Sequence, residues 1–244
     1  MFYQNDVFIG VDVASGKLPY TVAVLNGNSH LVALEKCSLE EAVKYTGGYG
    51  SVIVAVNAPR YLPGGKMADG SFRDHLIPSP APDRFTDHRV AEYLLRVRMV
   101  RFSPTPAPSE RIPTWINNGF RLYRQLEQTL SPLLDGRSIL EVNSQACYQT
   151  FLGRMPFHKT AIEGRIQRQL ILIDRGVKIH DPMSFYEEIT RHRILQGILP
   201  DAMLYSPRQL DAMAAALLAS LSYQDPAATV RIGDDTDGWI TLPA

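Results

Sequence analysis

Three carboxylates stand in this sequence where an ionised side chain is costly. Asp12 ends a mostly apolar stretch at residues 7–13, Glu141 lies near the end of another at 138–142, and Asp211 sits in a nearly apolar segment at 206–219. A buried carboxylate is unfavourable unless it is paired, hydrogen-bonded or bound to a cation. Carboxylate oxygens are also the ligands that Mg²⁺ and Mn²⁺ prefer. We therefore take all three as candidate metal ligands and catalytic residues.

The chemistry expected of such a cluster is phosphodiester cleavage. In open α/β sheets, ligands gather at the carboxyl ends of the strands. If the strands that carry Asp12 and Glu141 run parallel, both acids emerge at the same end, and the last helix could bring Asp211 beside them. Two divalent ions about 4 Å apart would then activate a water and stabilise the leaving oxygen.

Each acid also has an ordinary structural interpretation. Asp12, followed by Ser15 and Gly16, could form a turn at a strand end. Asp211 lies near the positive end of its helix and could interact with the helix dipole. Glu141 could pair with Arg137 or another arginine. The joint placement of the three acids is what favours the metal site.

Basic side chains could contact a phosphate backbone near these acids. Lys159 could neutralise a scissile phosphate, and Arg165 could do the same, although a solvated helix start is the more ordinary interpretation of both. Arg89 and Arg96 are seven residues apart and share a helix face, so they could follow a nucleic-acid backbone. Glu92 lies between them at helical spacing and could instead pair with both.

The elements that must position these residues begin with a strand-rich segment. Apolar, β-rich stretches at 7–13, 20–25, 31–36 and 51–56 predict four strands, with Asn26-Gly27-Asn28 as a hairpin turn between the second and third. Ser38 with Glu41 predicts a short helix before the fourth strand. This pattern is typical of an α/β layer.

Residues 58–134 predict an insertion over one edge of the sheet. Two proline-rich stretches, at 77–82 and 104–108, are incompatible with helix, whereas 86–101 and 113–134 have helical patterns. A strand at 138–142 and helices at 161–175 and 183–195 follow. Ser206, Pro207 and Gln209 give the clearest helix start, and the tail predicts a short hairpin.

Composition excludes several classes of protein. The 244 residues contain 25 Lys and Arg against 25 Asp and Glu, so binding of nucleic acid by overall positive charge is excluded. No segment approaches the roughly 18 apolar residues of a membrane span, and no signal peptide is evident. Cys37 and Cys147 have neither metal nor disulfide spacing, so we expect a cytoplasmic protein without a membrane partner.

Short motifs distributed over nearly the whole chain resemble an uncharacterised bacterial and archaeal family of predicted nucleases with an RNase H-like fold. The resemblance rests on Gly10-Val11-Asp12, Val56-Asn57-Ala58-Pro59, Leu140-Glu141-Val142, His158-Lys159, Gly164-Arg165, Asp211-Ala212-Met213-Ala214-Ala215-Ala216, Ile232-Gly233-Asp234 and Gly238-Trp239-Ile240. It implies a mixed five-stranded sheet flanked by helices, with three antiparallel strands followed by two parallel ones. It also implies that Asp12, Glu141 and Asp211 are the acidic metal-binding positions.

One position departs from the family pattern. Asn57 replaces an aspartate that the family typically carries on the fourth strand. An amide can coordinate a metal or contact substrate, but it supplies no charge and cannot act as a base. The last helix has Arg208, not a second acid, three residues before Asp211. This donor set is small for two divalent ions.

We therefore predict one RNase H-like domain over residues 1–244, with the insertion at 58–134. The predicted function is a Mg²⁺- or Mn²⁺-dependent nuclease or phosphodiesterase. Asp12, Glu141, Asp211 and Lys159 would be catalytic, and Asn57, Arg89 and Arg165 would bind a nucleic acid or another phosphoester. The first alternative is a non-catalytic binding or regulatory module on the same scaffold. A phosphotransferase is the second, but the glycine-rich phosphate loops it requires are not evident.

Overall fold

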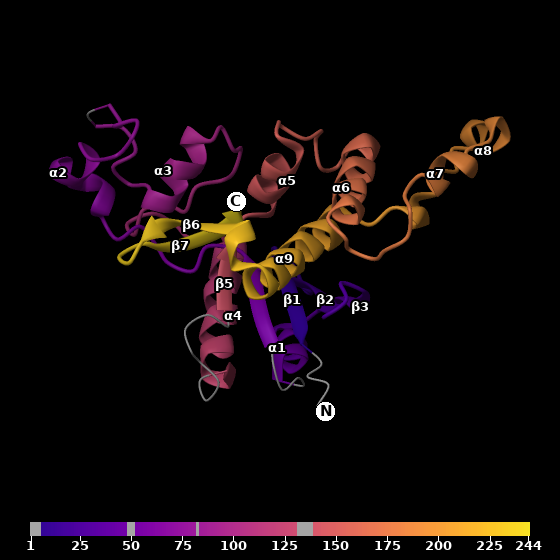
Figure 1. The fold of residues 1–244 in the computed structure, drawn as a ribbon, viewed down its shortest axis with the longest axis horizontal. Coiled ribbons are helices and arrows are strands. Elements are labelled where there is room, and N and C mark those ends of the chain that lie inside the picture. Colours follow the sequence, from indigo (N-terminus) through magenta and orange to yellow (C-terminus); the bar gives the residue numbers. More distant parts are fainter. Residues whose placement is uncertain (1–5, 48–51, 82, 131–138) are drawn as a thin grey trace.

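A mixed β-sheet occupies the middle of the molecule (Figure 1). The computed structural model describes residues 6–47, 52–81, 83–130 and 139–244. Within these residues the sheet has seven strands in the order β3-β2-β1-β4-β5-β7-β6. The strands are β1 (Val7–Val13), β2 (Tyr20–Asn26), β3 (Leu31–Cys37), β4 (Val52–Asn57), β5 (Ile139–Val142), β6 (Thr229–Asp234) and β7 (Gly238–Pro243).

Helices cover both faces of this sheet, which confirms the predicted α/β class. They are α1 (Leu39–Gly47), α2 (Gly70–Arg73), α3 (Val90–Val97), α4 (Thr114–Leu130), α5 (Ser144–Leu152), α6 (Ile162–Asp174), α7 (Ser184–Glu187), α8 (Arg191–Leu195) and α9 (Pro207–Gln224). Among the described helices, none is long and apolar enough to cross a membrane.

The sheet is antiparallel from β3 to β1 and parallel from β1 to β7, and its edge strand β6 pairs antiparallel with β7. β1 pairs antiparallel with β2, and β2 with β3, whereas β1, β4 and β5 pair in parallel. The predicted C-terminal hairpin is formed by β6 and β7. It does not stand apart, because β7 pairs in parallel with β5, and the described sheet therefore has seven strands where five were expected.

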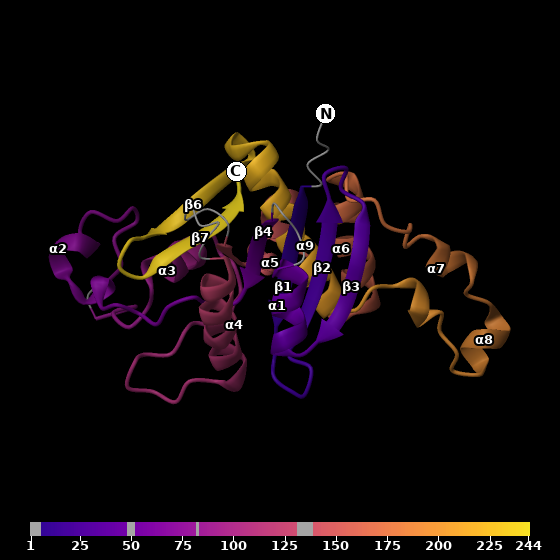
Figure 2. The same ribbon diagram turned by 90° about the horizontal axis from the view of Figure 1, so that it is seen from below.

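Alternation along β1 divides the core into two layers. Successive side chains of a strand point to opposite faces. Phe8 belongs to the cluster packed against α9, whereas Val7, Ile9, Val11 and Val13 belong to the cluster packed against α1 and α4. Figure 2 shows α1 and α4 on one side of the sheet and α9 on the other. Asp12 has the parity of Phe8 and so lies on the α9 face.

The last helix begins as predicted. Ser206 is its N-cap, its side chain accepts from the backbone N–H of Gln209, and the Gln209 side chain accepts from the backbone N–H of Ser206. Such a reciprocal box satisfies backbone donors that the first helical turn leaves free. It fixes the residue at which α9 starts, and therefore where Arg208 and Asp211 stand.

Gly10 allows α9 to lie directly on β1. A Cβ atom at residue 10 would come within 1.9 Å of the Ala212 carbonyl oxygen and 2.2 Å of the Ala216 nitrogen. Both neighbours are backbone atoms of a buried helix, which cannot give way without moving the helix itself. The close approach requires glycine on the strand and small residues on the helix.

Two predicted helices differ from the observed ones. The segment predicted at 86–101 is helical only over Val90–Val97, since Arg89 is extended and Met99 has a positive φ of 58°. The segment at 183–195 forms two short helices, α7 and α8, which lie far from the sheet in Figure 1. The end predicted for the helix at 113–134 lies outside the described residues.

The Gly10 contact predicts a strongly destabilising substitution. Gly10→Ala should lower the free energy of unfolding by about 3 kcal/mol, because overpacking against helix backbone has no flexible neighbour to absorb it. Urea unfolding followed by circular dichroism measures this. Gly70→Ala is the matched control, since a Cβ atom there meets nothing within 4 Å. Equal stabilities of the two variants would contradict the packing argument.

Candidate functional site

A cavity of about 530 Å³ lies at the carboxyl ends of β1, β4 and β5. Its lining includes six residues singled out from the sequence: Asp12, Asn57, Arg89, Glu141, Lys159 and Asp211. Residues nearly 200 positions apart thus reach one cavity. Arg165 is not among the lining residues.

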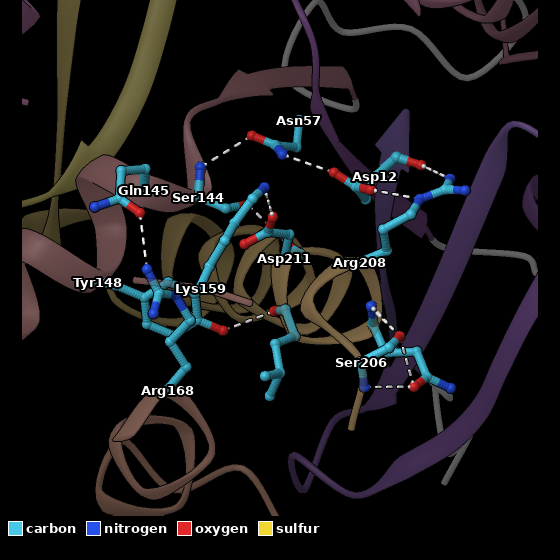
Figure 3. A network of polar contacts seen from close by, with 12 residues as sticks. Asp12, Asn57, Ser144, Gln145, Tyr148, Lys159, Arg168, Ser206, Arg208 and Asp211 are labelled. Atoms are coloured by element: carbon cyan, nitrogen blue, oxygen red, sulfur yellow. Dashed lines mark hydrogen bonds and ion pairs between the residues drawn. The ribbon is translucent and has the colours of Figure 1, made fainter. Parts of the chain in front are cut away.

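Asp12 is held from two sides. Its Oδ1 accepts a hydrogen bond of 2.8 Å from the side-chain amide of Asn57, and its Oδ2 accepts one of 3.0 Å from Nε of Arg208. The backbone N–H of Ser144 donates to the Asn57 carbonyl, which fixes the amide with its NH₂ group toward Asp12. Figure 3 shows Asn57 and Arg208 on either side of this carboxylate. The sequence did not indicate the roles of Arg208 and Ser144.

Asp12 nevertheless keeps its proton more firmly than an exposed aspartate does. Burial and, second, repulsion from Asp211 raise the pKa of Asp12 to about 6, against the lowering effects of Asn57 and Arg208. Like charges near each other disfavour ionisation, so the charge of Asp211 acts on Asp12. Both side chains line the same cavity.

Asp211 reaches the same cavity from the second turn of α9. Its Oδ2 accepts a 2.9 Å hydrogen bond from Nζ of Lys159, and the Ser144 hydroxyl donates to its backbone carbonyl. Burial alone would lower the pKa of Lys159, but the Asp211 carboxylate outweighs it and the net shift is upward. The Lys159 side chain is 49% exposed, whereas that of Asp211 is 4% exposed.

The loop that carries Lys159 is built around Arg168 and Gly164. Arg168 is buried on α6 and donates to the carbonyl oxygens of Phe157 and Gly164 and to the Gln145 side chain. A Cβ atom at Gly164 would lie 1.9 Å from the carbonyl oxygen of His158. Lys159 is thus positioned at Asp211 by neighbouring backbone contacts.

Glu141 points away from Asp12. In the parallel register Asp12 is level with Asn57, whereas Glu141 is level with Val56, which packs on the α4 face. Strand alternation therefore sends the Asp12 and Glu141 side chains to opposite faces of the sheet. Both line the cavity because it opens at the strand ends.

Both oxygens of Glu141 are occupied. Arg89 binds them with hydrogen bonds of 2.6 Å and 2.8 Å, and the backbone N–H of Arg60 donates to one of them. Burial acts to lower the pKa of Arg89, but the Glu141 carboxylate outweighs burial and raises it. The Arg89 side chain is 0% exposed, so it has no surface for the substrate contact predicted for it.

Asp237 connects three segments around this pair and was not found from the sequence. It is fully buried, its carboxylate accepts from the backbone N–H groups of Gly64 and Val90, and its carbonyl accepts from Nε of Arg89. The Val90 contact caps α3 from a distant turn, which explains why that helix starts later than predicted. Asp234-Asp235-Thr236-Asp237 resembles an ordinary turn, so no local signal marks this residue.

The remaining basic candidates are engaged elsewhere. Arg165 pairs with Asp201 at 2.8 Å and donates to the carbonyl oxygens of Leu204 and Tyr205. Arg96 donates to His88. Glu92 forms no hydrogen bond with Arg89 or Arg96 among the described contacts, and its Oε1 accepts from Thr105 instead.

Asp12, Glu141 and Asp211 were predicted to bind a divalent metal ion together. The described residues contain no group of three or more His, Cys, Asp or Glu residues with the geometry of a metal site. Glu141 is bound by Arg89, so the three predicted acids do not form one ligand set. Asp12 and Asp211 remain a repelling pair of hard oxygen donors.

Comparison with known proteins identifies no relative. No family model matches the chain, and neither a curated protein nor a solved structure is significantly similar to it.

The raised pKa of Asp12 predicts a pH-dependent stability. The unfolded chain releases this proton near pH 3.8 and the folded chain near 6, so folding takes up a proton between these values. Ionisation then disfavours the folded state, and the contribution of Asp12 falls by about 3 kcal/mol as pH rises through this window.

Urea unfolding from pH 3.5 to 7.5 in a chelating buffer measures this effect. The wild type should lose stability relative to Asp12→Asn as the pH rises from 4 to 6. Asp201→Asn, at an exposed carboxylate, serves as the control. A wild-type minus Asp12→Asn difference that stays constant over the window would refute the assignment.

The buried Arg89–Glu141 pair predicts a large loss when one partner is removed. Arg89→Met leaves an uncompensated carboxylate inside the protein and should cost about 3–5 kcal/mol of unfolding free energy. Arg193→Met is the control, because the Arg193–Glu188 pair is about 40% exposed on both sides and should cost less than about 1 kcal/mol. Chemical denaturation gives the unfolding free energy of both variants. Similar losses in Arg89→Met and Arg193→Met would contradict the claim that burial makes the Arg89–Glu141 pair the more important one.

Proposed function

We propose that this protein is a divalent-metal-dependent phosphodiesterase of the nuclease type on an RNase H-like scaffold. The observation that carries the proposal is that two buried carboxylates, Asp12 from β1 and Asp211 from α9, line one cavity together with Lys159. Two acids that repel each other at a cavity wall favour a cation between them. A lysine beside them favours an anionic substrate.

The topology supports the RNase H-like assignment. The order β3-β2-β1-β4-β5, antiparallel from β3 to β1 and parallel from β1 to β5, is the arrangement that the family resemblance implies. In that arrangement the first strand and the last helix carry acids that face one another. The hairpin of β6 and β7 would then be an addition at the β5 edge.

Asp12 and Asp211 would hold one divalent ion. Such an ion, when bound, supplies polarisation of the phosphoryl group and stabilisation of the leaving oxygen. Glu141 is not used as a ligand in this proposal, because Arg89 and Arg60 occupy its oxygens. The expectation of Mg²⁺ or Mn²⁺ is kept, with one ion in place of two.

The chain's own residues would have separate tasks. Asn57 and Arg208 orient Asp12 through one oxygen each, and at pH 7.5 this carboxylate is mostly ionised. Lys159 is half exposed, so its ammonium group can exchange the Asp211 carboxylate for a non-bridging phosphate oxygen. Arg89 has no such freedom and would act only by holding Glu141.

A non-catalytic binding module remains a second candidate on one specific observation. Each of the three acids already has a basic partner: Arg208 for Asp12, Arg89 for Glu141 and Lys159 for Asp211. Charge balance of this kind would let the cavity persist without a metal ion. The two candidates differ in whether the protein takes up Mn²⁺.

Asp211→Asn should reduce Mn²⁺-dependent cleavage of labelled single-stranded DNA and RNA by at least about 100-fold, since even residues that only support a metal ligand typically contribute 10–100-fold. Gel analysis of the products measures this. The control is Asp201→Asn, which makes the same chemical change at an ion pair outside the cavity lining.

Calorimetry separates the two candidates. Titration of Mn²⁺ into the wild type should show a specific site that Asp12→Asn and Asp211→Asn lack. Absence of both Mn²⁺ uptake and cleavage in the wild type would favour the binding module. Full cleavage by Asp211→Asn would reject the proposed site.

A further inference from the structure

The segment that follows α3, residues 100–105, is fastened at both of its ends. The helix closes in a left-handed turn at Met99, after which the backbone N–H of Val100 donates to the carbonyl oxygen of Leu95. Val100 is buried in the core. At the other end, the backbone N–H and the hydroxyl of Thr105 both donate to the buried carboxylate of Glu92. The residues between these two anchors are therefore held in place.

These intervening residues belong to the wall of the cavity. Arg101, Phe102 and Ser103 all line it. Arg101 and Ser103 are exposed, whereas Phe102 is partly buried. Ser103 precedes Pro104, and a residue before proline is restricted to extended conformations. An exposed arginine on a fixed, extended segment of the wall is accessible to a ligand that enters the cavity.

Arg101 differs from the other cations of the lining in having no acidic partner. Arg89 is bound to Glu141, and Lys159 is bound to Asp211. Arg101 forms no hydrogen bond or ion pair with any residue in the described parts of the chain. A guanidinium group has five N–H donors in a planar fork that matches the oxygens of a phosphate. Its free donors favour an anionic group of the ligand.

Arg101 and Lys159 reach the cavity from different elements. Arg101 is on the segment that leaves α3, and Lys159 is on the loop that enters α6. In both ribbon views α5 lies between these two helices (Figure 1, Figure 2). The volume of about 530 Å³ is in the range of small-molecule sites and exceeds what one phosphate group needs. The cavity thus has room for two anionic groups, one at each cation.

A nucleic-acid strand offers such a second anion, because it carries a phosphate on either side of the scissile one. Contacts to these neighbouring phosphates fix the register of a strand on a protein without reading its sequence. An isolated phosphodiester has no second phosphate. A cation beyond the reacting group therefore distinguishes a strand from a small phosphoester.

We propose that Arg101 binds the phosphate next to the scissile one, so that the substrate of this protein is a single strand of nucleic acid. This inference rests on the proposed function, in which Lys159 contacts the scissile phosphate, and it names the substrate class. Glu92 is a positioning residue in this account, since it holds the segment that carries Arg101.

The salt dependence of binding tests the phosphate contact. Fluorescence anisotropy of a labelled single strand in a chelating buffer, from about 50 to about 200 mM salt, measures affinity without cleavage. Each phosphate contact on a single strand adds about 0.7 to the slope of log affinity against log salt concentration. Arg101→Gln should lower the magnitude of this slope by about 0.7 and weaken binding about tenfold.

Two further variants control this measurement. Arg98→Gln removes the same charge from an exposed arginine outside the cavity lining and should leave the slope and the affinity unchanged. Arg101→Lys keeps the charge and should restore the slope. An equal loss in Arg98→Gln would show that only overall charge matters and would overturn the role of Arg101.

Kinetics of Mn²⁺-dependent cleavage tell the neighbouring phosphate from the scissile one. Arg101→Gln should raise KM for the strand about tenfold and keep kcat within about twofold, because a contact made equally in the ground and transition states affects binding alone. A kcat that falls together with kcat/KM would place Arg101 at the reacting phosphate and reject its assignment to the neighbouring one.

The proposed function and this inference fail in different ways. An unchanged slope and KM in Arg101→Gln would overturn the inference, while cleavage by the wild type would leave the proposed function standing. A wild type that binds strands through Arg101 without Mn²⁺-dependent cleavage would reject the proposed function and leave a phosphate contact of a binding module. A wild type that does not bind strands would remove this inference, and absence of cleavage as well would remove both.

Discussion

The contact between α9 and β1 at Gly10 is the constraint on which the site depends. With no side chain at residue 10, the backbone of the helix rests on the backbone of the central strand. Side chains in the early turns of the helix then reach the end of the strand, which brings Arg208 and Asp211 to Asp12. A larger residue would lift the helix and separate these groups. The absence of a side chain at Gly10, two residues before Asp12, is thus what allows the charged groups of α9 to lie beside Asp12.

The alternation of side chains along the strands places Asp12 and Glu141 on opposite faces of the sheet. Asp12 and Asn57 share one row on the α9 face, whereas Glu141 lies in the row of Val56 on the other face. On the α9 side, the acids meet partly exposed bases, Arg208 and Lys159, which a ligand can rearrange. On the α4 side, Glu141 is bound by Arg89, whose side chain is fully buried. One residue of register thus separates a carboxylate with a partly exposed basic partner from one whose basic partner is buried.

Features that depend on neighbouring residues could be predicted from the sequence. The box at Ser206 and Gln209, a hairpin turn after Asn26 and the fourth strand are local patterns, and the structure confirms them. The details differ, because the positive φ of the turn falls on Ser29 and the strand predicted at 51–56 is Val52–Asn57. The orientation of Glu141 could not be predicted, because it depends on the register of β5 against β4, which no pattern within either strand fixes. Asp237 acts through Gly64, Arg89 and Val90, which lie 147 to 173 residues away in the chain. These contacts exist only after folding, so the residue type alone carries no signal.

Asp237 also links the last hairpin to the interior of the cavity. Its carboxylate accepts hydrogen bonds from the backbone N–H groups of Gly64 and Val90, and its carbonyl accepts one from Nε of Arg89. One turn residue therefore holds a loop, the start of α3 and a buried guanidinium in place. Fraying of β6 and β7 would release all three together and leave Glu141 with a loosened partner. The order of the β6–β7 hairpin is thus coupled to the buried Arg89–Glu141 ion pair. Local unfolding of this hairpin would therefore disturb the cavity wall from outside the cavity.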